Sequence, residues 1–288
     1  VRTLDGNFRL YPNGPRILDD CHRLGFDLLP QVIWRKPTNS PNKFMGSGVL
    51  PAGAYVTLEH EHILVMRKGR KRDFSAEADR TRRQHSAIFW EERNTWFSDL
   101  WDLRGVNQNF LADEPAGDLP GQVRVEGVPE PAPFQQQAQA LPRDRSAAYP
   151  LELAERLILM YSVQGDTVLD PFLGTGTTTL AAIGSGRQSI GVEIEPELAA
   201  FCLKRISQEV PQLNQRVADR LGRHRRWAGE YQAKHPGTLA HFNQTYRCPV
   251  MTAQESELLL HYVSAMAAEG AGTSRASLQV THHIYSPA

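Results

Sequence analysis

Residues 170–178 combine acidic, glycine and threonine residues in an order that suits a cofactor-binding turn. Asp170 ends an apolar stretch, and Gly174 and Gly176 follow where a missing side chain lets the backbone approach a ligand. The residues after Gly176 are predicted to begin a helix, and the N–H groups of a helix N-terminus bind carboxylates and phosphates. Glu193 follows 17 residues after Gly176, where an acidic side chain can accept both hydroxyls of a ribose. The pattern predicts a site for a nucleotide-type ligand.

Three kinds of ligand use a glycine turn of this type. A nucleoside triphosphate site has Gly-Lys-Ser/Thr at the end of the loop, and no lysine stands here. A dinucleotide site has the spacing G-x-G-x-x-G, but Thr179 stands in place of the third glycine and Asp170 would face a pyrophosphate unfavourably. The same aspartate would attract an ammonium or sulfonium group. The residues therefore favour S-adenosylmethionine, with a nicotinamide-dependent oxidoreductase as the weaker alternative.

Regular elements are predicted on both sides of the turn. A helix over 151–161, a strand over 166–172, a helix from 177 to 183, a strand over 188–194 and a helix over 196–210 contain a β-α-β unit of the α/β class. Upstream, hydrophobic spacing predicts a helix over 13–24, a strand over 26–34 and a strand over 55–66. Residues 253–268 are predicted to be helical. Residues 113–139 hold five prolines and are typical of a linker or a long functional loop.

Positive charge is concentrated in two places, although 32 Lys and Arg balance 32 Asp and Glu overall. Between residues 67 and 83, eight Lys and Arg stand against three acidic residues. A second cluster comprises Arg216, Arg220, Arg223, Arg225 and Arg226, opposed only by Asp219. Such clusters can neutralise the phosphates of a polyanion, and ordinary solvated surfaces carry them too. The charge pattern permits an enzyme with one basic cleft.

The cofactor turn and its flanks resemble one known family, the bacterial amino-methyltransferases of DNA. The matching stretches are Tyr149-Pro150, 157–158, 161–162, 165–178 and 191–194 around the turn, and 31–37, 44–48, 60–69, 89–93 and 96–101 nearer the N-terminus. Their order is that of the β-type members, in which the cofactor motifs follow the catalytic ones. The resemblance covers residues 2–206, and its glycine motif is the specific part.

The resemblance implies an α/β fold, a Rossmann-like methyltransferase sheet with circularly permuted motif order and a recognition insertion. It implies S-adenosylmethionine as cofactor, double-stranded DNA as partner, and methylation of N4 of cytosine in preference to N6 of adenine, within a restriction–modification system. The cofactor residues that it implies are Tyr149, Pro150, Asp170, Pro171, Phe172, Gly174, Gly176, Thr177 and Glu193. The candidate DNA-binding residues are Lys36, Arg70, Lys71, Arg72, Arg82 and Arg83.

One motif of the family has no counterpart in this chain. Its catalytic tetrapeptide, Ser/Asp/Asn-Pro-Pro followed by an aromatic residue, holds the amine of a flipped base, and these 288 residues contain no Pro-Pro dipeptide. We therefore assign no catalytic residue. We expect Val1 to lie inside a longer protein, or a complementing N-terminal fragment or subunit to supply the tetrapeptide. The alternative function is then a catalytically incomplete DNA-binding methyltransferase subunit.

Four regions follow from these assignments. Residues 1–69 are the C-terminal half of a catalytic subdomain, 70–140 a target-recognition insertion and linker, 141–210 the cofactor-binding subdomain, and 211–288 a helical extension. Three scattered cysteines and the absence of any long apolar run indicate a reduced, cytoplasmic protein with no membrane segment. His60 and His62 share one strand face without a readable third ligand, so no metal site is predicted.

Overall fold

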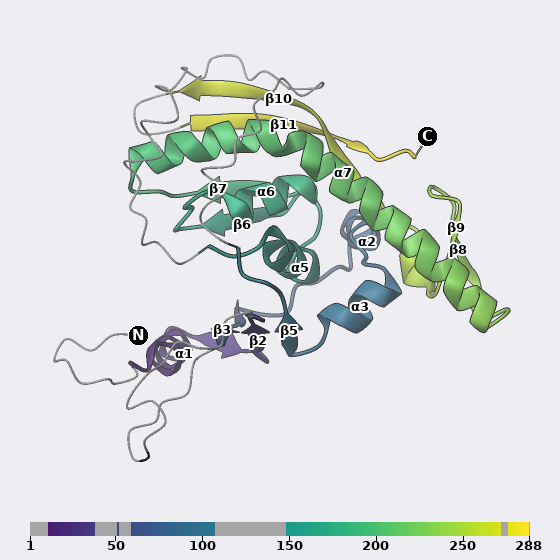
Figure 1. Cartoon of the computed structure of the whole chain (residues 1–288), viewed down its shortest axis with the longest axis horizontal. Coiled ribbons are helices and arrows are strands. Elements are labelled where there is room, and N and C mark those ends of the chain that lie inside the picture. Colours follow the sequence, from purple (N-terminus) through teal and green to yellow (C-terminus); the bar gives the residue numbers. More distant parts are fainter. Residues whose placement is uncertain (1–10, 38–50, 52–58, 107–147, 272–275, 288) are drawn as a thin grey trace. The chain divides into compact units, whose positions relative to one another are not determined.

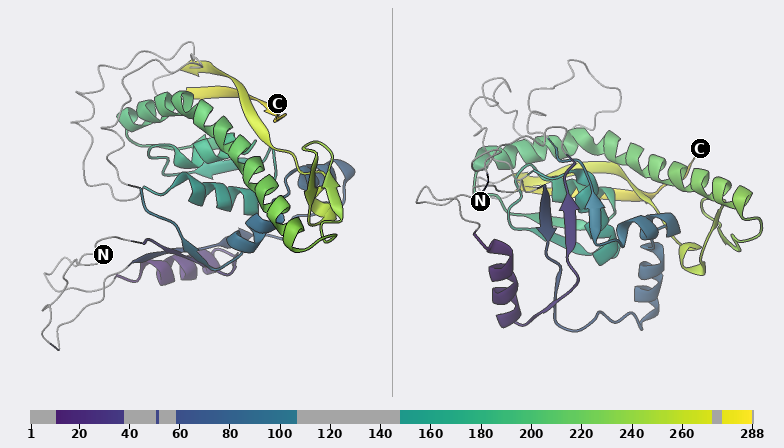
Figure 2. Two further views of the ribbon diagram at one scale, coloured as in Figure 1. Left: turned by 45° about the vertical axis from the view of Figure 1, so that its right-hand side comes forward. Right: turned by 60° about the horizontal axis from the view of Figure 1, so that its bottom comes forward.

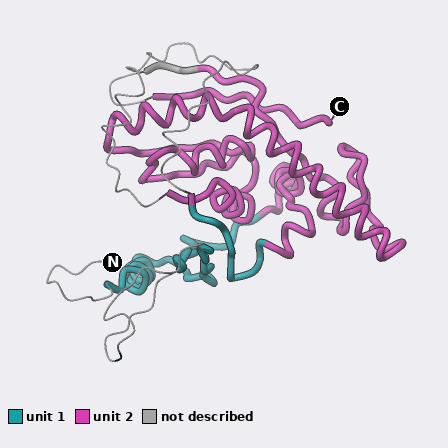
Figure 3. Tube along the Cα trace, viewed as in Figure 1, with its two compact units in different colours: residues 1–73, 96–105 teal, residues 74–95, 106–288 magenta. Residues whose placement is uncertain are grey.

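The computed structural model describes residues 11–37, 51, 59–106, 148–271 and 276–287. The chain divides into two compact units (Figure 3). Unit 1 comprises residues 1–73 and 96–105, and unit 2 comprises residues 74–95 and 106–288. Residues 107–140 of the predicted recognition insertion and linker lie outside the described residues. The elements are labelled in Figure 1.

Unit 1 consists of one helix and short strands. The helix α1 (Asn13–Arg23) is followed by β1 (Phe26–Leu28) and β2 (Val32–Arg35), and later by β3 (His60–Ile63), β4 (Met66–Lys68) and β5 (Leu100–Asp102). β2 pairs with antiparallel β3 and parallel β5, while β1 pairs with β4. The single strand predicted over 26–34 is interrupted at Pro30, because proline has no N–H to donate to a sheet. Trp34 and Trp101 are buried and form the core of this sheet.

Unit 2 contains the predicted β-α-β unit. The β-α-β unit consists of β6 (Thr167–Asp170), α6 (Thr177–Gly184) and β7 (Gln188–Gly191), and the helix α5 (Leu151–Tyr161) precedes it. β6 and β7 are parallel, with Leu169 opposite Ile190 and Asp170 opposite Gly191. The order of strand, glycine turn, helix and strand is confirmed, although β7 is shorter than predicted. On one face of the pair, Val168 packs with residues of α5 and α6.

The helix α7 (Pro196–Lys234) is 39 residues long and continues through Pro211, where the sequence predicts an end at Val210. An apolar stripe explains the continuation, since its burial offsets the backbone hydrogen bond that an internal proline removes. In its first half the stripe packs with α6 and with a C-terminal hairpin. In its second half it packs with Phe89 and residues around Tyr246. The buried members of the stripe are Leu198, Cys202, Ile206, Val210, Leu213, Val217 and Leu221.

The α-helical part of the C-terminal region ends at Lys234. It continues as β8 (His241–Asn243), β9 (Cys248–Val250), the short 3-10 helix η2 (Ala253–Glu255), β10 (His261–Ala271) and β11 (Ala276–Ile284). The helix predicted over 253–268 is therefore wrong. β10 pairs antiparallel with β11 (Figures 1 and 2). Val263 and Met266 of β10 pack into the cluster formed by α6 and α7. This burial outweighs the helix propensity of the alanines in β10, which is a weak preference.

Two further helices, α2 (Glu77–His85) and α3 (Trp90–Trp96), lie in the segment predicted to belong to the insertion. Residues 74–95 belong to unit 2, and Phe89 is fully buried in a cluster with Val217 and Leu221 of α7. Sequence patterning does not reveal this assignment, because it depends on contacts between residues more than a hundred positions apart.

Candidate cofactor site

The turn between β6 and α6 is a tight, glycine-dependent loop. Gly174 and Gly176 have φ angles of 55° and 84°, in the left-handed region that favours glycine. Asp170 Oδ1 accepts a hydrogen bond from the N–H of Phe172 at 3.0 Å, which ties the strand end to the loop. Gly176 is the N-cap of α6, and no side chain caps this helix start. The first N–H groups of α6 therefore have no side-chain cap, and uncapped groups of this kind can bind an anion.

Two glycines of the site are also required by packing. A Cβ atom on Gly176 would lie 2.3 Å from Cys202 Sγ, and one on Gly191 would lie 2.5 Å from Leu173 Cδ1. The sequence assigns Gly176 to close approach of a ligand, whereas the structure shows close approach of α7. Burial raises the pKa of the Cys202 thiol to about 12, so this cysteine is a packing residue with no thiolate character at neutral pH.

Glu193 follows β7 and lies at the glycine turn. Its Oε2 accepts a hydrogen bond from the N–H of Gly174 at 2.9 Å, and its Oε1 accepts one from the N–H of Glu195 at 3.1 Å. The carboxylates of Asp170 and Glu193 thus both accept hydrogen bonds from backbone N–H groups beside the turn. The site is acidic, which suits a cationic ligand better than a polyphosphate.

Tyr149 and Pro150 are positioned by the start of α5. Pro150 is the N-cap residue of that helix, and the Tyr149 hydroxyl lies 2.5 Å from Thr178 Oγ1 in the first turn of α6. Burial raises the pKa of Tyr149, and the neighbouring Asp170 acts in the same direction. The structure therefore brings Tyr149 together with Asp170 and the start of α6, although they are 21 residues or more apart in sequence.

Apolar side chains beside the site are exposed. Phe172 and Ile194 are 87% and 89% exposed, and Pro171 is also exposed. Leu169 and Ile190 face away from α5 and α6 and are 62% and 55% exposed. These exposures show that one face of β6–β7 is uncovered in the described residues. Parallel sheets normally have both faces covered.

Arg205 is a site residue that the sequence analysis missed. Its Nη1 donates to Thr175 O and Thr175 Oγ1 at 3.0 Å each and to Thr177 Oγ1 at 3.3 Å. Its Nε donates to Glu209 Oε1 at 2.6 Å. The sequence does place Arg205 and Glu209 four residues apart on a predicted helix, a spacing that indicates an ion pair on one helix face.

The candidate DNA-binding residues are divided between the two units. Lys36 forms an ion pair with Glu61, Arg82 forms one with Asp79, and Arg83 lies over the Phe74 ring. Arg70, Lys71 and Arg72 are exposed and belong to unit 1, whereas Arg82 and Arg83 belong to unit 2.

The second basic cluster is largely used inside unit 2. Arg216 pairs with Glu155, Arg220 pairs with Glu92 at 2.7 Å, and Arg225 donates to the carbonyl of Tyr246 at 2.8 Å. Arg223 and Arg226 are exposed. Most of this cluster therefore holds α7 to its neighbours.

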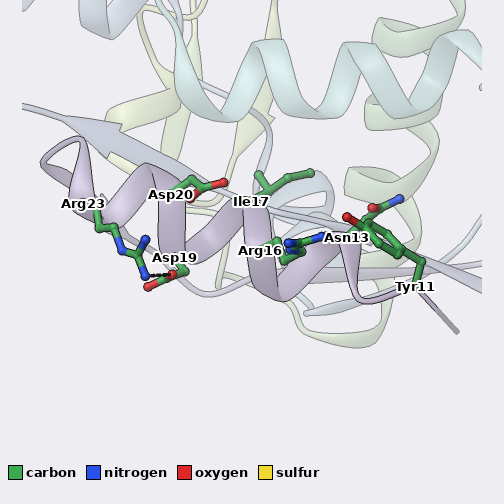
Figure 4. Close-up of a pocket in the computed structure, with 7 residues that line it drawn as sticks. All are labelled: Tyr11, Asn13, Arg16, Ile17, Asp19, Asp20 and Arg23. Carbon is green, nitrogen blue, oxygen red and sulfur yellow. Dashed lines mark ion pairs between the residues drawn. The ribbon is translucent and has the colours of Figure 1, made fainter.

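The hollow shown in Figure 4 is formed by residues of unit 1. It has a volume of about 550 Å³ and lies along α1, where Asp19 and Arg23 form an exposed ion pair at 2.5 Å. Its lining residues are Tyr11, Asn13, Arg16, Ile17, Asp19, Asp20 and Arg23. None of the predicted cofactor residues contributes to it.

Metal ligands do not cluster within the described ranges. No group of three His, Cys, Asp or Glu side chains there is arranged to hold a metal ion. His60 and His62 lie edge to face with ring centroids 5.1 Å apart. No helix in the same residues is long and apolar enough to cross a membrane.

A glycine turn between parallel strands, flanked by two carboxylates and a helix N-terminus, defines a nucleotide-type cofactor domain. The family described as DNA methylase matches residues 10–204, about two thirds of the chain. The chain therefore belongs to the DNA methylase family.

Two curated relatives and one solved structure illustrate the likeness. The type II methyltransferase M.MthZI of Methanothermobacter thermautotrophicus is 42% identical over 263 residues, covering 91% of this chain and 65% of the relative. The type II methyltransferase M.MjaI of Methanocaldococcus jannaschii is 41% identical over 206 residues, covering 72% and 58%. A Thermus thermophilus structure, described as a putative DNA modification methylase complexed with S-adenosyl-L-methionine, is 32% identical with a TM-score of 0.46, covering 70% and 62%. The chain thus spans 58–65% of these proteins' length, less than two thirds in each case.

Proposed function

We propose that the chain binds S-adenosylmethionine at the β6–α6 turn and serves methyl transfer to an exocyclic amine of a base in double-stranded DNA. The observation that carries the proposal is the pairing of Asp170 and Glu193 with an uncapped helix start at one glycine turn. Membership of the DNA methylase family supports the reaction class. The names of the two relatives support a place in a restriction–modification system.

The residues present fit this cofactor. The uncapped N–H groups at the start of α6 would bind its carboxylate, Asp170 would attract its ammonium group, and Glu193 would accept the ribose hydroxyls. Phe172 and Ile194, both exposed, would be covered by its adenine. Tyr149, Pro150, Pro171, Gly174, Gly176 and Thr177 complete the proposed pocket. When bound, the cofactor supplies an electrophilic methyl group, and the protein's part is to hold donor and base nitrogen in line.

We assign no catalytic residue, and we propose N4 of cytosine in preference to N6 of adenine as the acceptor. The open face of β6–β7 supports the alternative function, in which this chain requires a further segment that carries the tetrapeptide. Leu169 and Ile190 are apolar, opposite each other and exposed, which is the surface that another α/β element would bury. The proposed phosphate contacts are Lys36, Arg70, Lys71, Arg72, Arg82 and Arg83, of which Arg70, Lys71, Arg72 and Arg83 are exposed. We also propose a cytoplasmic location.

Calorimetric titration of the chain with S-adenosylmethionine tests the cofactor site, with NAD as the parallel control. We expect micromolar binding of S-adenosylmethionine and none of NAD. Asp170→Ala should weaken this binding by about tenfold or more, because it removes the carboxylate that faces the ammonium group. Absence of heat from folded protein would overturn the proposed cofactor.

Methyl transfer is tested separately. The chain is incubated with labelled S-adenosylmethionine and duplex DNA, alone and with an added polypeptide that carries the tetrapeptide. Activity of the chain alone would reject the incomplete-subunit alternative, and activity only with the added polypeptide would support it.

A further inference from the structure

Arg205 connects α7 to the glycine turn, although it is 28 residues from Thr177 in sequence. One nitrogen, Nη1, reaches the backbone carbonyl of Thr175 and the hydroxyls of Thr175 and Thr177. These acceptors stand on both sides of Gly176, the residue that begins α6. The guanidinium therefore spans the point at which the loop becomes a helix.

The guanidinium is itself held in place. Its Nε donates to Glu209 one helical turn further along α7, and the side chains of Arg205 and Glu209 are 17% and 30% exposed. One turn earlier, Cys202 packs so closely on Gly176 that no side chain could be added there. Thus α7 contacts the turn at two successive positions of one face, by packing at Cys202 and by hydrogen bonds at Arg205.

We propose that Arg205, oriented by Glu209, is a positioning residue that fixes residues 174–177 in the conformation that binds the cofactor carboxylate. The effect on cofactor binding rests on the proposed function, whereas the positioning of the loop by Arg205 does not depend on that function. A loop with two positive-φ glycines has many accessible conformations, and a planar fork with several fixed acceptors selects one of them. Preorganisation of this kind lowers the ordering cost of binding.

The predicted consequence is a loss of affinity with little change in fold. In Arg205→Met the aliphatic stem still packs on α7, while the hydrogen bonds to Thr175 and Thr177 are lost. We expect the Kd for S-adenosylmethionine to rise by about tenfold. Arg205→Lys keeps the charge and a single donor group, so it should restore part of the affinity. Arg216→Met is the matched control, because Arg216 lies on the same helix and pairs with Glu155 away from the turn.

Two measurements on the full chain test the inference. Hydrogen–deuterium exchange of the free protein should show faster exchange at residues 174–177 in Arg205→Met, and wild-type rates there in Arg216→Met. Calorimetry with S-adenosylmethionine should give the order wild type, Arg205→Lys, Arg205→Met from tightest to weakest. Denaturant unfolding of each variant separates this effect from a general loss of stability.

The outcomes distinguish this inference from the proposed function. Unchanged loop exchange in Arg205→Met overturns the positioning role, whatever the ligand. Faster loop exchange with unchanged affinity in a folded variant overturns the link to cofactor binding. If the wild-type loop depends on Arg205 but the wild-type chain binds no S-adenosylmethionine, the proposed function fails while the positioning role stands.

Discussion

The two halves of α7 lie in different surroundings within unit 2. Near its start, Cys202 and Arg205 contact the glycine turn, beside which Phe172 and Ile194 are almost fully exposed. Further along, α7 packs against Phe89, Tyr246 and the strand β9, a region in which both apolar and charged side chains are buried. The first region is thus open, with exposed apolar side chains beside the turn. The second is closed by its own residues.

The closed region is held by buried polar groups. His224 is fully buried, and its ring stacks on that of Phe89 with the ring centroids 3.9 Å apart. Its Nδ1 lies 3.0 Å from Glu91 Oε1, and its Nε2 lies 3.1 Å from the carbonyl oxygen of Pro249. Glu255, also buried, accepts from the N–H of Trp90 at 2.8 Å. These contacts join α3, α7, β9 and η2. The side chains of this region are therefore buried against one another, whereas Phe172 and Ile194 beside the glycine turn are exposed.

The largest expected effect is a loss of stability on substitution of Gly176, where α7 packs most tightly against the glycine turn. Gly176→Ala places a Cβ 2.3 Å from Cys202 Sγ at a φ of 84°, and should lower the free energy of unfolding by about 3 kcal/mol and abolish cofactor binding. Denaturant unfolding measures the loss. The double variant Gly176→Ala/Cys202→Ala should recover part of it, because the sulfur is removed. Full additivity of the two changes would exclude the contact as the cause.

A smaller loss of stability, which depends on pH, is expected on substitution of His224 in the closed region. Burial lowers the pKa of His224, but the neighbouring Cys248 and the hydrogen-bonded Glu91 outweigh it and raise the pKa to about 10. Because the folded-state pKa is raised, the stabilisation is complete below the unfolded value of about 6.5 and is lost as pH rises through 10.

We therefore expect His224→Gln to lower the free energy of unfolding by about 2–3 kcal/mol at about pH 6.5. The difference from wild type should shrink toward pH 10, while affinity for S-adenosylmethionine at neutral pH stays unchanged. Urea unfolding across this pH range provides the measurement. A difference that grows with pH would show that the buried imidazole is neutral.

The smallest effect is expected on the open face. Leu169→Ser should change the free energy of unfolding by less than about 0.5 kcal/mol, because the side chain is 62% exposed. Leu213→Ala, in the buried stripe of α7, is the comparison and should cost about 2–5 kcal/mol. Thermal unfolding of both variants tests the contrast. A large cost at Leu169 would mean that the face is covered in solution.

Local pattern accounts for the elements that were predicted correctly. The glycine turn, α5, α6 and the parallel strands follow from apolar spacing and from glycines that punctuate it, and the structure brings Asp170, Glu193 and Tyr149 to the same turn. Local pattern fails for β10, because its alanine-rich sequence favours a helix and only pairing with β11 makes it a strand. It fails for α7 as well, since buried partners carry the helix through Pro211.

The ligand class predicted for the turn depends on residue types at fixed short spacings, namely an aspartate, two glycines, and a glutamate after the next strand. Such local features can be identified in the sequence without knowing how the chain folds. Tertiary structure alone decided that Gly176 accommodates Cys202, that Arg205 reaches Thr175 and Thr177, and that Arg216 and Arg220 are used in ion pairs. These are contacts between residues far apart in the chain. Their energies depend on distances and burial that arise only when the helices pack.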